Sequence, residues 1–444
     1  MSEERFAYLQ DVVTWSPSKR TWKTIKSCFE LWPQGEERKA ALIYASERLN
    51  HWDSVLRIAE FHDGHPCWPL VTHWDIPEEI SSKRIQNILS FSRHITYLTL
   101  SFENLVSTMD VLSINPHIDS LCVKGERVES AQSAFCRLPH LKRLFMSSLF
   151  EKEDLSPFAE LLNLQTFRAG FSHFHLIKDI GTLKQLPHLE ELQLPNCSSL
   201  DNLRSLEGLH RLKKLSIRKL SNSHDLKVLS ELKNLRTLTL FEPNEVQEED
   251  VSSLTQLEEL SIDYDFRRSL ELLAPLKNLR TLELEGCGRL ESLWGIGALS
   301  SLKKLKIAST FRLRDISGLE KLMKLRALSI RAISHVKDLS AIRTSQHLRE
   351  LIIHIFNEEK ARAFLPENGL LVQLYLAYCP ILRCLDGIQE NPHLFILYLK
   401  GLERVEEIPN IHSFKELRYL SIVDCPLLKE SKSFKNLSLA EYNC

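Results

Sequence analysis

The sequence predicts an α/β repeat solenoid in which about fifteen parallel strands lie side by side, joined by short return segments. Three observations lead to this fold class. A leucine-containing motif recurs about every 23 residues, and apolar residues alternate inside the motif. The chain of 444 residues is also longer than one ordinary hydrophobic core organises. A repeat architecture satisfies all three.

The motif is clearest in two segments, "LKNLRTLTL" at 232–240 and "LKNLRTLEL" at 276–284. Aligned on the middle leucine of L-x-x-L-x-L, it occurs fifteen times in steps of 22, 23 or 25 residues. Only Phe167 departs from leucine, and it is apolar. The fifteen aligned positions are Leu98, Leu121, Leu144, Phe167, Leu192, Leu215, Leu238, Leu260, Leu282, Leu305, Leu328, Leu351, Leu374, Leu397 and Leu420.

Each unit reads as one strand followed by one return segment. Its short alternating stretch has the period of a strand, and the longer remainder has apolar residues about three apart. A unit of this length has too little interior to bury its own leucines. Stacking of neighbouring units would place strand beside strand and create a continuous apolar column.

From Ser90 to Leu428 this pattern resembles the leucine-rich repeat family. That family places Asn or Cys five residues after the middle leucine, and this chain has Cys197, Cys287, Cys379 and Cys425 there. The resemblance implies a curved horseshoe with the parallel sheet on its concave side. The unit length and a "DLSxL" turn are similar to the bacterial and phosphatase-regulator-like subclass. We expect the four cysteines to be buried.

Acidic residues often open the return segments, at Asp154, Asp225, Asp315 and Asp338. We interpret them as caps that accept hydrogen bonds from the free amides of a helical turn, and not as catalytic carboxylates. The segment 357–365, "NEEKARAFL", is the return segment that we expect to be a proper helix.

The two ends differ in composition from the repeats. Residues 1–88 hold six of the seven tryptophans and read as three or four helices, residues 89–432 form the predicted solenoid, and residues 433–444 read as a C-terminal cap. Solenoids need capped ends, so we interpret residues 1–88 as a helical cap. An adaptor or effector domain in the same segment is the alternative.

Composition argues against several function classes. With 57 basic and 58 acidic side chains, the chain lacks the net positive charge that would attract nucleic acid or anionic lipid. The start, "MSEERFAYLQDVV", lacks the features of a secretory signal, and no run is long enough to span a membrane. The cysteines show no paired spacing, which favours reduced thiols. We expect a cytoplasmic protein that binds neither nucleic acid nor membrane.

Motifs that carry chemistry are missing from the sequence, which has no phosphate-binding glycine loop and no paired-cysteine metal signature. We therefore expect no enzymatic activity and no cofactor. Two histidine patterns leave alternatives open. His62, His65, Cys67 and His73 could hold zinc but match no known spacing, so a surface loop is preferred. A row of histidines before the repeat leucines is read as a polar turn position.

Residues that flank the middle leucines are predicted to project from the concave side, because side chains of a strand alternate between its faces. Ile352, Tyr375 and Tyr398 occupy one such place in three consecutive units, which predicts an exposed stripe. Exposed aromatic patches usually mark binding sites. The predicted partner-binding residues here are Ile352, His354, Tyr375, Ile396, Tyr398, Tyr419 and Val423. The alternative is that the end of the solenoid curls over these rings.

Charged residues define a second predicted surface nearer the N-terminus. It combines an acidic block with neighbouring lysines, and a partner with a basic segment would face the acidic block. The residues are Glu259, Asp263, Glu283, Glu285, Lys304 and Lys306.

The function expected from the sequence is a non-enzymatic scaffold or recognition module that holds a protein on its concave sheet. The alternative is a sensor or effector in which the repeats recognise a target while residues 1–88 act on it. Neither the identity of the partner nor the oligomeric state follows from the sequence.

Overall fold

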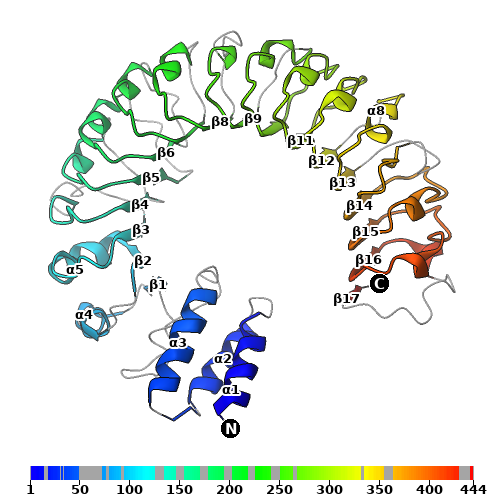
Figure 1. Ribbon diagram of the computed structural model, residues 1–444. Coiled ribbons are helices and arrows are strands. Elements are labelled where there is room, and N and C mark those ends of the chain that lie inside the picture. Colours follow the sequence, from blue (N-terminus) through cyan, green and yellow to red (C-terminus); the bar gives the residue numbers. More distant parts are fainter. Residues whose placement is uncertain are drawn as a thin grey trace. The chain divides into compact units, whose positions relative to one another are not determined.

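Figure 1 presents the computed structural model of the chain. It describes residues 2–443 with the exception of these residues and segments: 15–18, 31, 34, 50–72, 77–79, 92–94, 126–134, 147–154, 171–178, 195–202, 219–225, 242–250, 264–267, 332–334, 355–363 and 430–440. The chain forms two units, Met1–Asp201 and Asn202–Cys444. Each unit is described by itself.

In the first unit the strands pair in parallel, each with the next along the chain. The register aligns the repeat positions, with Leu98 opposite Leu121, then Leu144, Phe167 and Leu192. The strands are β1 (His73–Asp75), β2 (Tyr97–Ser101), β3 (Ser120–Lys124), β4 (Arg143–Met146), β5 (Thr166–Ala169) and β6 (Glu191–Leu194).

The second unit continues the same pattern from Leu215 to Leu420, and every repeat leucine lies opposite the next. Its strands are β7 (Lys214–Arg218), β8 (Thr237–Phe241), β9 (Glu259–Asp263), β10 (Thr281–Glu285), β11 (Lys304–Ala308), β12 (Ala327–Arg331), β13 (Glu350–His354), β14 (Gln373–Ala377), β15 (Ile396–Lys400), β16 (Tyr419–Val423) and β17 (Glu441–Asn443). The predicted fold class is confirmed, since β2–β16 carry the fifteen aligned positions.

Return segments lie on the outer side of the curve in each unit, and the strands line the inner side (Figure 1). Most described returns contain a single 3₁₀ turn. These turns are η3 (Ser156–Phe158), η5 (Gly181–Gln185), η6 (Arg204–Leu206), η7 (Leu226–Glu231), η8 (Glu271–Leu273), η9 (Ile296–Ala298), η10 (Leu319–Lys321), η12 (Ile388–Glu390) and η13 (Ile411–Ser413). The α-helical returns are α5 (Phe102–Ser113), α8 (Ser340–Arg343) and α9 (Pro426–Lys429). Most of the expected helix at 357–365 lies outside the described residues.

The core is the column of repeat side chains between the sheet and the returns. The middle leucines are at most 1% exposed, and Phe167 is fully buried against Phe158, with ring centroids 5.1 Å apart. Cys287, Cys379 and Cys425 are fully buried, so this expectation is confirmed for them, while Cys197 lies outside the described residues. Their thiols donate to the carbonyl two residues earlier, at 3.2–3.5 Å.

The predicted cap is confirmed at Asp338, which accepts at 2.9 Å from the amide of Ser340, the first residue of α8. The Asp315 carboxylate accepts from the Ser317 amide at 2.8 Å, but Ser317 lies two residues before η10, so this aspartate stabilises the preceding turn and does not cap the helical one. Asp154 and Asp225 lie outside the described residues.

Three helices precede β1 among the described residues of the first unit, α1 (Ser2–Val12), α2 (Lys19–Glu30) and α3 (Glu36–Leu49). A further helix, α4 (Ser82–Phe91), lies between β1 and β2 in the chain. Phe29 and Trp32 stack between these helices with centroids 5.7 Å apart. The sheet itself begins at β1, inside the segment 1–88 that the sequence assigns to the N-terminal domain. The described helices include none that is both long and apolar enough to cross a membrane.

The chain ends in β17, which pairs in parallel with β16 and places Tyr442 opposite Leu420. Residues 441–443 therefore add one more rung to the sheet. The role of residues 433–444 as a cap stays a prediction, as do the boundaries of the three predicted segments.

Candidate functional site

The aromatic stripe predicted from the sequence, Ile352, Tyr375 and Tyr398, forms a row across β13, β14 and β15. The strand register places Ile352 opposite Tyr375 and Tyr375 opposite Tyr398. The two tyrosine rings stack with centroids 5.6 Å apart and planes 29° apart. All three side chains are half-buried, so the rings are reachable from solvent and are not enclosed.

Beside the stripe lies an open hollow of about 250 Å³, which we call the tyrosine hollow. Strands β14, β15 and β16 form it, and it is lined by Tyr375, Ile396, Leu397, Tyr398, Tyr419, Leu420 and Ser421. Tyr419 is 39% exposed and packs against Phe395 at 5.5 Å between centroids. A preformed apolar hollow with phenol groups at its rim suits one large side chain of a protein partner.

Basic residues lie at the carboxyl ends of β12, β13 and β15, and Ala377 takes the equivalent place on β14. Arg331 lies opposite His354 in the register, and Lys400 lies opposite Ala377 two strands further on. We call Arg331, His354 and Lys400 the basic edge. Arg331 and Lys400 form no ion pair with a carboxylate among the described residues.

Tyr378 contacts two residues of the basic edge, His354 and Lys400. Its ring meets that of His354 edge-on at 4.9 Å, and the Lys400 Nζ lies 5.3 Å from its centroid. A hydrogen bond with Tyr378 raises the pKa of Lys400, so its ammonium is charged. Burial, together with the charges of Arg331 and Lys400, lowers the pKa of His354. The two lowering charges indicate a positive potential at this edge.

The conformation of Tyr378 comes from the turn that follows each strand. Tyr378 has a φ of 53°, and Gly286, Ser309, Gly401 and Asp424 have similar positive values at the equivalent place. Gly401 is needed beneath the ring, because a Cβ there would lie 2.8 Å from the Tyr378 Cδ1. Tyr378, Lys400 and Phe395 were not predicted from the sequence. Comparing the residue after each strand across units would have singled out Tyr378.

The remaining predicted residues of this surface also lie on the described strands. His354 and Val423 are at the carboxyl ends of β13 and β16, and Ile396 and Tyr419 are neighbours at the start of β15 and β16. The structure thus brings all seven residues onto four consecutive strands. Their role in binding stays a prediction.

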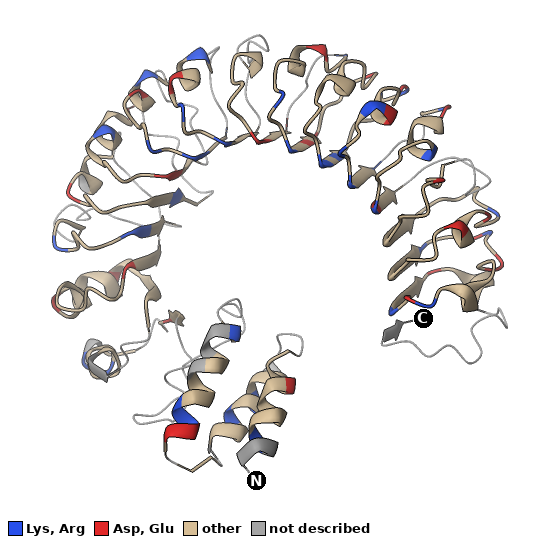
Figure 2. Cartoon of the chain, in the orientation of Figure 1, with Lys and Arg blue, Asp and Glu red and all other residues tan. Residues whose placement is uncertain are grey.

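The second predicted surface is largely paired within itself. Lys304 lies 3.1 Å from Glu283, and Lys306 lies 3.8 Å from Glu283 and 3.9 Å from Glu285. Thr237 donates to Glu259 at 3.1 Å, and Asp263 is half-buried on the neighbouring strand. Figure 2 shows both signs of charge along these inner strands. Because Lys304 and Lys306 pair with Glu283 and Glu285, the surface has less unpaired negative charge for a basic partner than the sequence predicts.

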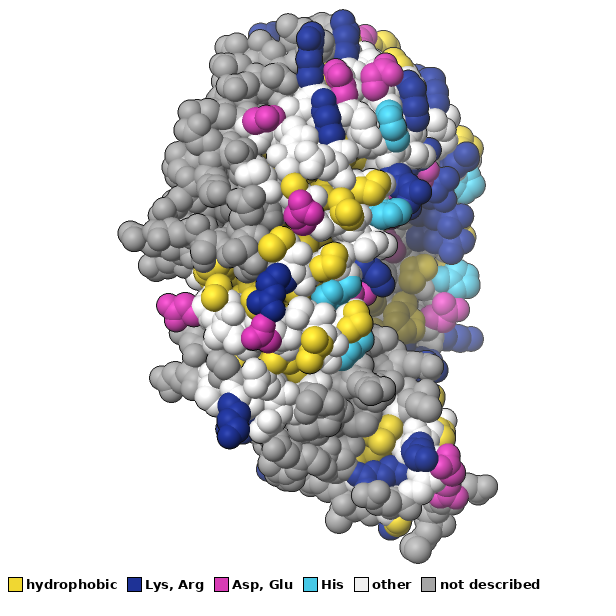
Figure 3. Space-filling model, turned by 90° about the vertical axis from the view of Figure 1, so that its left-hand side faces the viewer, with side chains coloured by type: hydrophobic (Ala, Val, Ile, Leu, Met, Phe, Trp, Pro, Cys, Tyr) yellow, Lys and Arg dark blue, Asp and Glu magenta, His cyan; other side chains and the backbone are white. Residues whose placement is uncertain are grey.

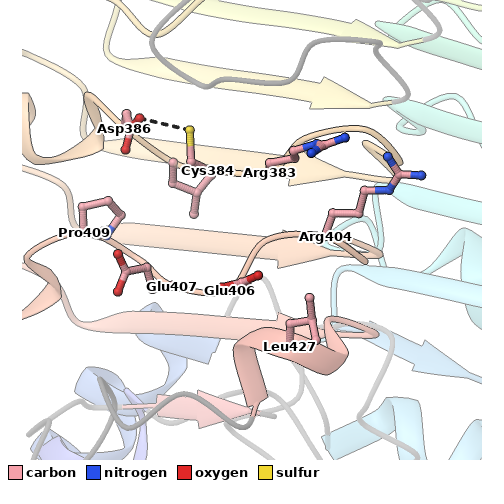
Figure 4. Close-up of a pocket in the computed structure, with 9 residues that line it drawn as sticks. Arg383, Cys384, Asp386, Arg404, Glu406, Glu407, Pro409 and Leu427 are labelled. Carbon is pink, nitrogen blue, oxygen red and sulfur yellow. Dashed lines mark hydrogen bonds between the residues drawn. The ribbon is translucent and has the colours of Figure 1, made fainter.

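Another pocket, of about 730 Å³, lies beyond the ends of β14 and β15 (Figure 4). Figure 4 places Arg383 and Arg404 toward one end and Asp386 and Glu407 toward the other. The Cys384 thiol donates to Asp386 at 3.1 Å. This wide, mixed-charge hollow was not predicted, and its groups show no arrangement that favours a particular ligand.

Hydrophobic and histidine side chains are interspersed on the side of the molecule shown in Figure 3. Exposed large hydrophobic residues of the first unit include Val106, Ile114 and Leu162. They come from α5 and from the turn before β5, and single exposed apolar residues are common on soluble proteins.

The residues considered as zinc ligands, for which a surface loop was the preferred interpretation, are only partly described. His62, His65 and Cys67 lie outside the described residues. His73 stacks on Tyr97 with centroids 4.1 Å apart, and its Nε2 lies 2.8 Å from the Thr99 hydroxyl. The described part of the chain contains no group of three or more residues placed to hold a metal ion.

This chain is similar to known proteins in structure. No protein-family model matches the sequence, and no curated protein matches it. A leucine-rich repeat protein from Leptospira interrogans is similar with a TM-score of 0.54 and 18% identity, over 84% of this chain and 96% of that chain. An internalin from Listeria monocytogenes has a TM-score of 0.47 and 16% identity, over 76% and 88% of the two chains. At 18% identity, the similarity to the Leptospira protein shows a shared fold.

Proposed function

We propose that this chain, which has the leucine-rich repeat fold, is a protein-binding module whose main contact surface is the aromatic stripe and the tyrosine hollow. The proposed role is non-enzymatic. One observation carries it, namely that Ile352, Tyr375 and Tyr398 stand in register on a sheet face where an open hollow adjoins them. Partly exposed tyrosines on a rigid scaffold are typical anchors of protein interfaces.

The sheet supports this role through its rigidity. Each ring is fixed by a strand whose leucines on the other face are fully buried, such as Leu374 and Leu397. Stacked tyrosines lose little conformational freedom when a partner binds, so more of the contact energy appears as affinity. Cytoplasmic location is part of the proposal and is tested by fractionation of the host cell.

The experiment that tests the proposal compares proteins captured from the native host by the wild-type chain and by Tyr375→Ala/Tyr398→Ala. Quantitative mass spectrometry measures each captured protein. We expect the yield of the specific partner to fall at least about tenfold, because truncating interface tyrosines costs roughly 1–2 kcal/mol each. The melting temperature should stay nearly unchanged, since both rings are partly exposed.

The matched control is Phe311→Ala/Met323→Ala, which removes two exposed apolar side chains outside the strands, where Phe311 is 65% and Met323 is 53% exposed. It should capture the partner as the wild type does. Equal capture by wild-type and tyrosine variants would refute the proposal.

A further inference from the structure

We propose that the partner segment is extended and carries a large apolar side chain and, two residues away, a carboxylate. The apolar side chain fills the tyrosine hollow, and the carboxylate meets Lys400, while Arg331 adds positive charge three strands away on the same edge. The inference rests on the proposed function and adds the chemistry of the partner.

Unpaired positive charge beside the hollow is the first argument. On β11 of the same face, Lys304 and Lys306 lie 3.1 and 3.8 Å from Glu283 and so already have an acidic partner. Arg331 and Lys400 have none among the described residues, although Lys400 feels the nearby charge of Asp424. A carboxylate from a partner would supply the missing ion pair, and charge complementarity of this kind orients and selects partners.

The geometry of β15 gives the spacing. Tyr398 and Lys400 are two residues apart on one strand and therefore project from the same face about 6.6 Å apart. Side chains two residues apart in an extended partner segment have the same separation. An apolar side chain over Tyr398 thus brings a carboxylate over Lys400.

The aromatic contacts keep the basic edge in place. Tyr378 contacts both His354 and Lys400, which limits the movement of the ammonium group. Asp424 and Glu350 are the exposed acidic residues nearest in the register, and they lie at opposite ends of the strands. Among the described residues of β12–β16, a basic partner residue would therefore meet separated carboxylates, whereas an acidic one would meet the positive charge of Lys400.

The test is a selection of random 12-residue peptides displayed on phage against the full chain. We expect the enriched peptides to share an apolar residue and, two positions away, Asp or Glu. Their affinity should fall at least about tenfold for Arg331→Glu/Lys400→Glu, and that variant should itself enrich peptides with Lys or Arg. Lys214→Glu on β7 reverses one positive charge far along the sheet and should leave the enriched set unchanged.

The outcomes separate this inference from the proposed function. Peptides that need Tyr375 and Tyr398 but show no acidic preference would overturn the inference and leave the proposed function standing. A selection in which no peptide loses binding to Tyr375→Ala/Tyr398→Ala, including one that enriches nothing, would overturn both.

Discussion

Single residues in this chain are fixed by short-range hydrogen bonds that repeat from unit to unit. The Asp315 carboxylate illustrates them, because it accepts from the Ser317 amide at 2.8 Å and from the Ser292 hydroxyl at 2.7 Å. Burial opposes ionisation, but these hydrogen bonds outweigh it and lower the pKa of Asp315. The charged form is therefore the stabilising one.

Replacing Asp315 by alanine should lower the free energy of unfolding by about 1 kcal/mol at pH 7, because the hydrogen bonds from Ser317 and Ser292 are lost. Because the folded pKa is lowered, the stabilisation is fully present above the unfolded value. It is lost as the pH falls through the folded pKa. Urea unfolding at pH 7 and at pH 3 measures the effect. A difference between wild type and variant that is the same at both pH values would contradict this assignment.

Glycines inside the return segments help to determine how neighbouring elements pack, in addition to the buried leucines. Gly295, which precedes η9, has a φ of 96°, and a Cβ there would lie 2.6 Å from the Glu271 backbone. Gly208 also has a φ of 96°, but nothing lies within 4 Å of its Cβ position. Substitutions at Gly208 test the backbone conformation alone, whereas substitutions at Gly295 also test the close packing between neighbouring units.

Alanine at Gly208 should cost about 1–2 kcal/mol, the penalty for an L-residue in the left-handed region. Alanine at Gly295 should cost about 1–3 kcal/mol more, because the backbone of the adjacent unit must also move. Denaturant unfolding of the two variants gives both values. Equal losses would show that the close approach of η8 and η9 is absent in solution.

At the scale of the whole molecule, the stability of each repeat depends on its neighbours, and this was the most predictable property. The spacing of the leucines predicted β2–β16 because a buried position must recur once per unit in a stacked sheet. The spacing carried no information about β1, a three-residue strand outside the repeat. It also missed Tyr378 and Lys400, since their contacts depend on a left-handed turn that hydrophobic periodicity does not encode.

Removal of one complete repeat tests this dependence. Deleting residues 329–351 joins Leu328 to Ile352 and keeps both the alternation and the aromatic stripe. We expect the shortened chain to fold and its circular dichroism spectrum to have the same shape as that of the wild type, because each repeat contacts only its neighbours. Deleting residues 329–340 instead shifts the register and should unfold or aggregate the chain. Similar behaviour of the two deletions would contradict the stacking of equivalent units.

The central claim, that a protein partner sits on the tyrosine hollow, is tested most directly by photo-crosslinking in the native host. A benzophenone side chain at Ser421, which lines the hollow, is compared with one at Ser300 in the turn after η9. We predict a discrete protein adduct from position 421 that disappears when Tyr375 and Tyr398 are alanine, and none from position 300. An adduct only from position 300, or one from position 421 that persists in the tyrosine variant, would contradict the account.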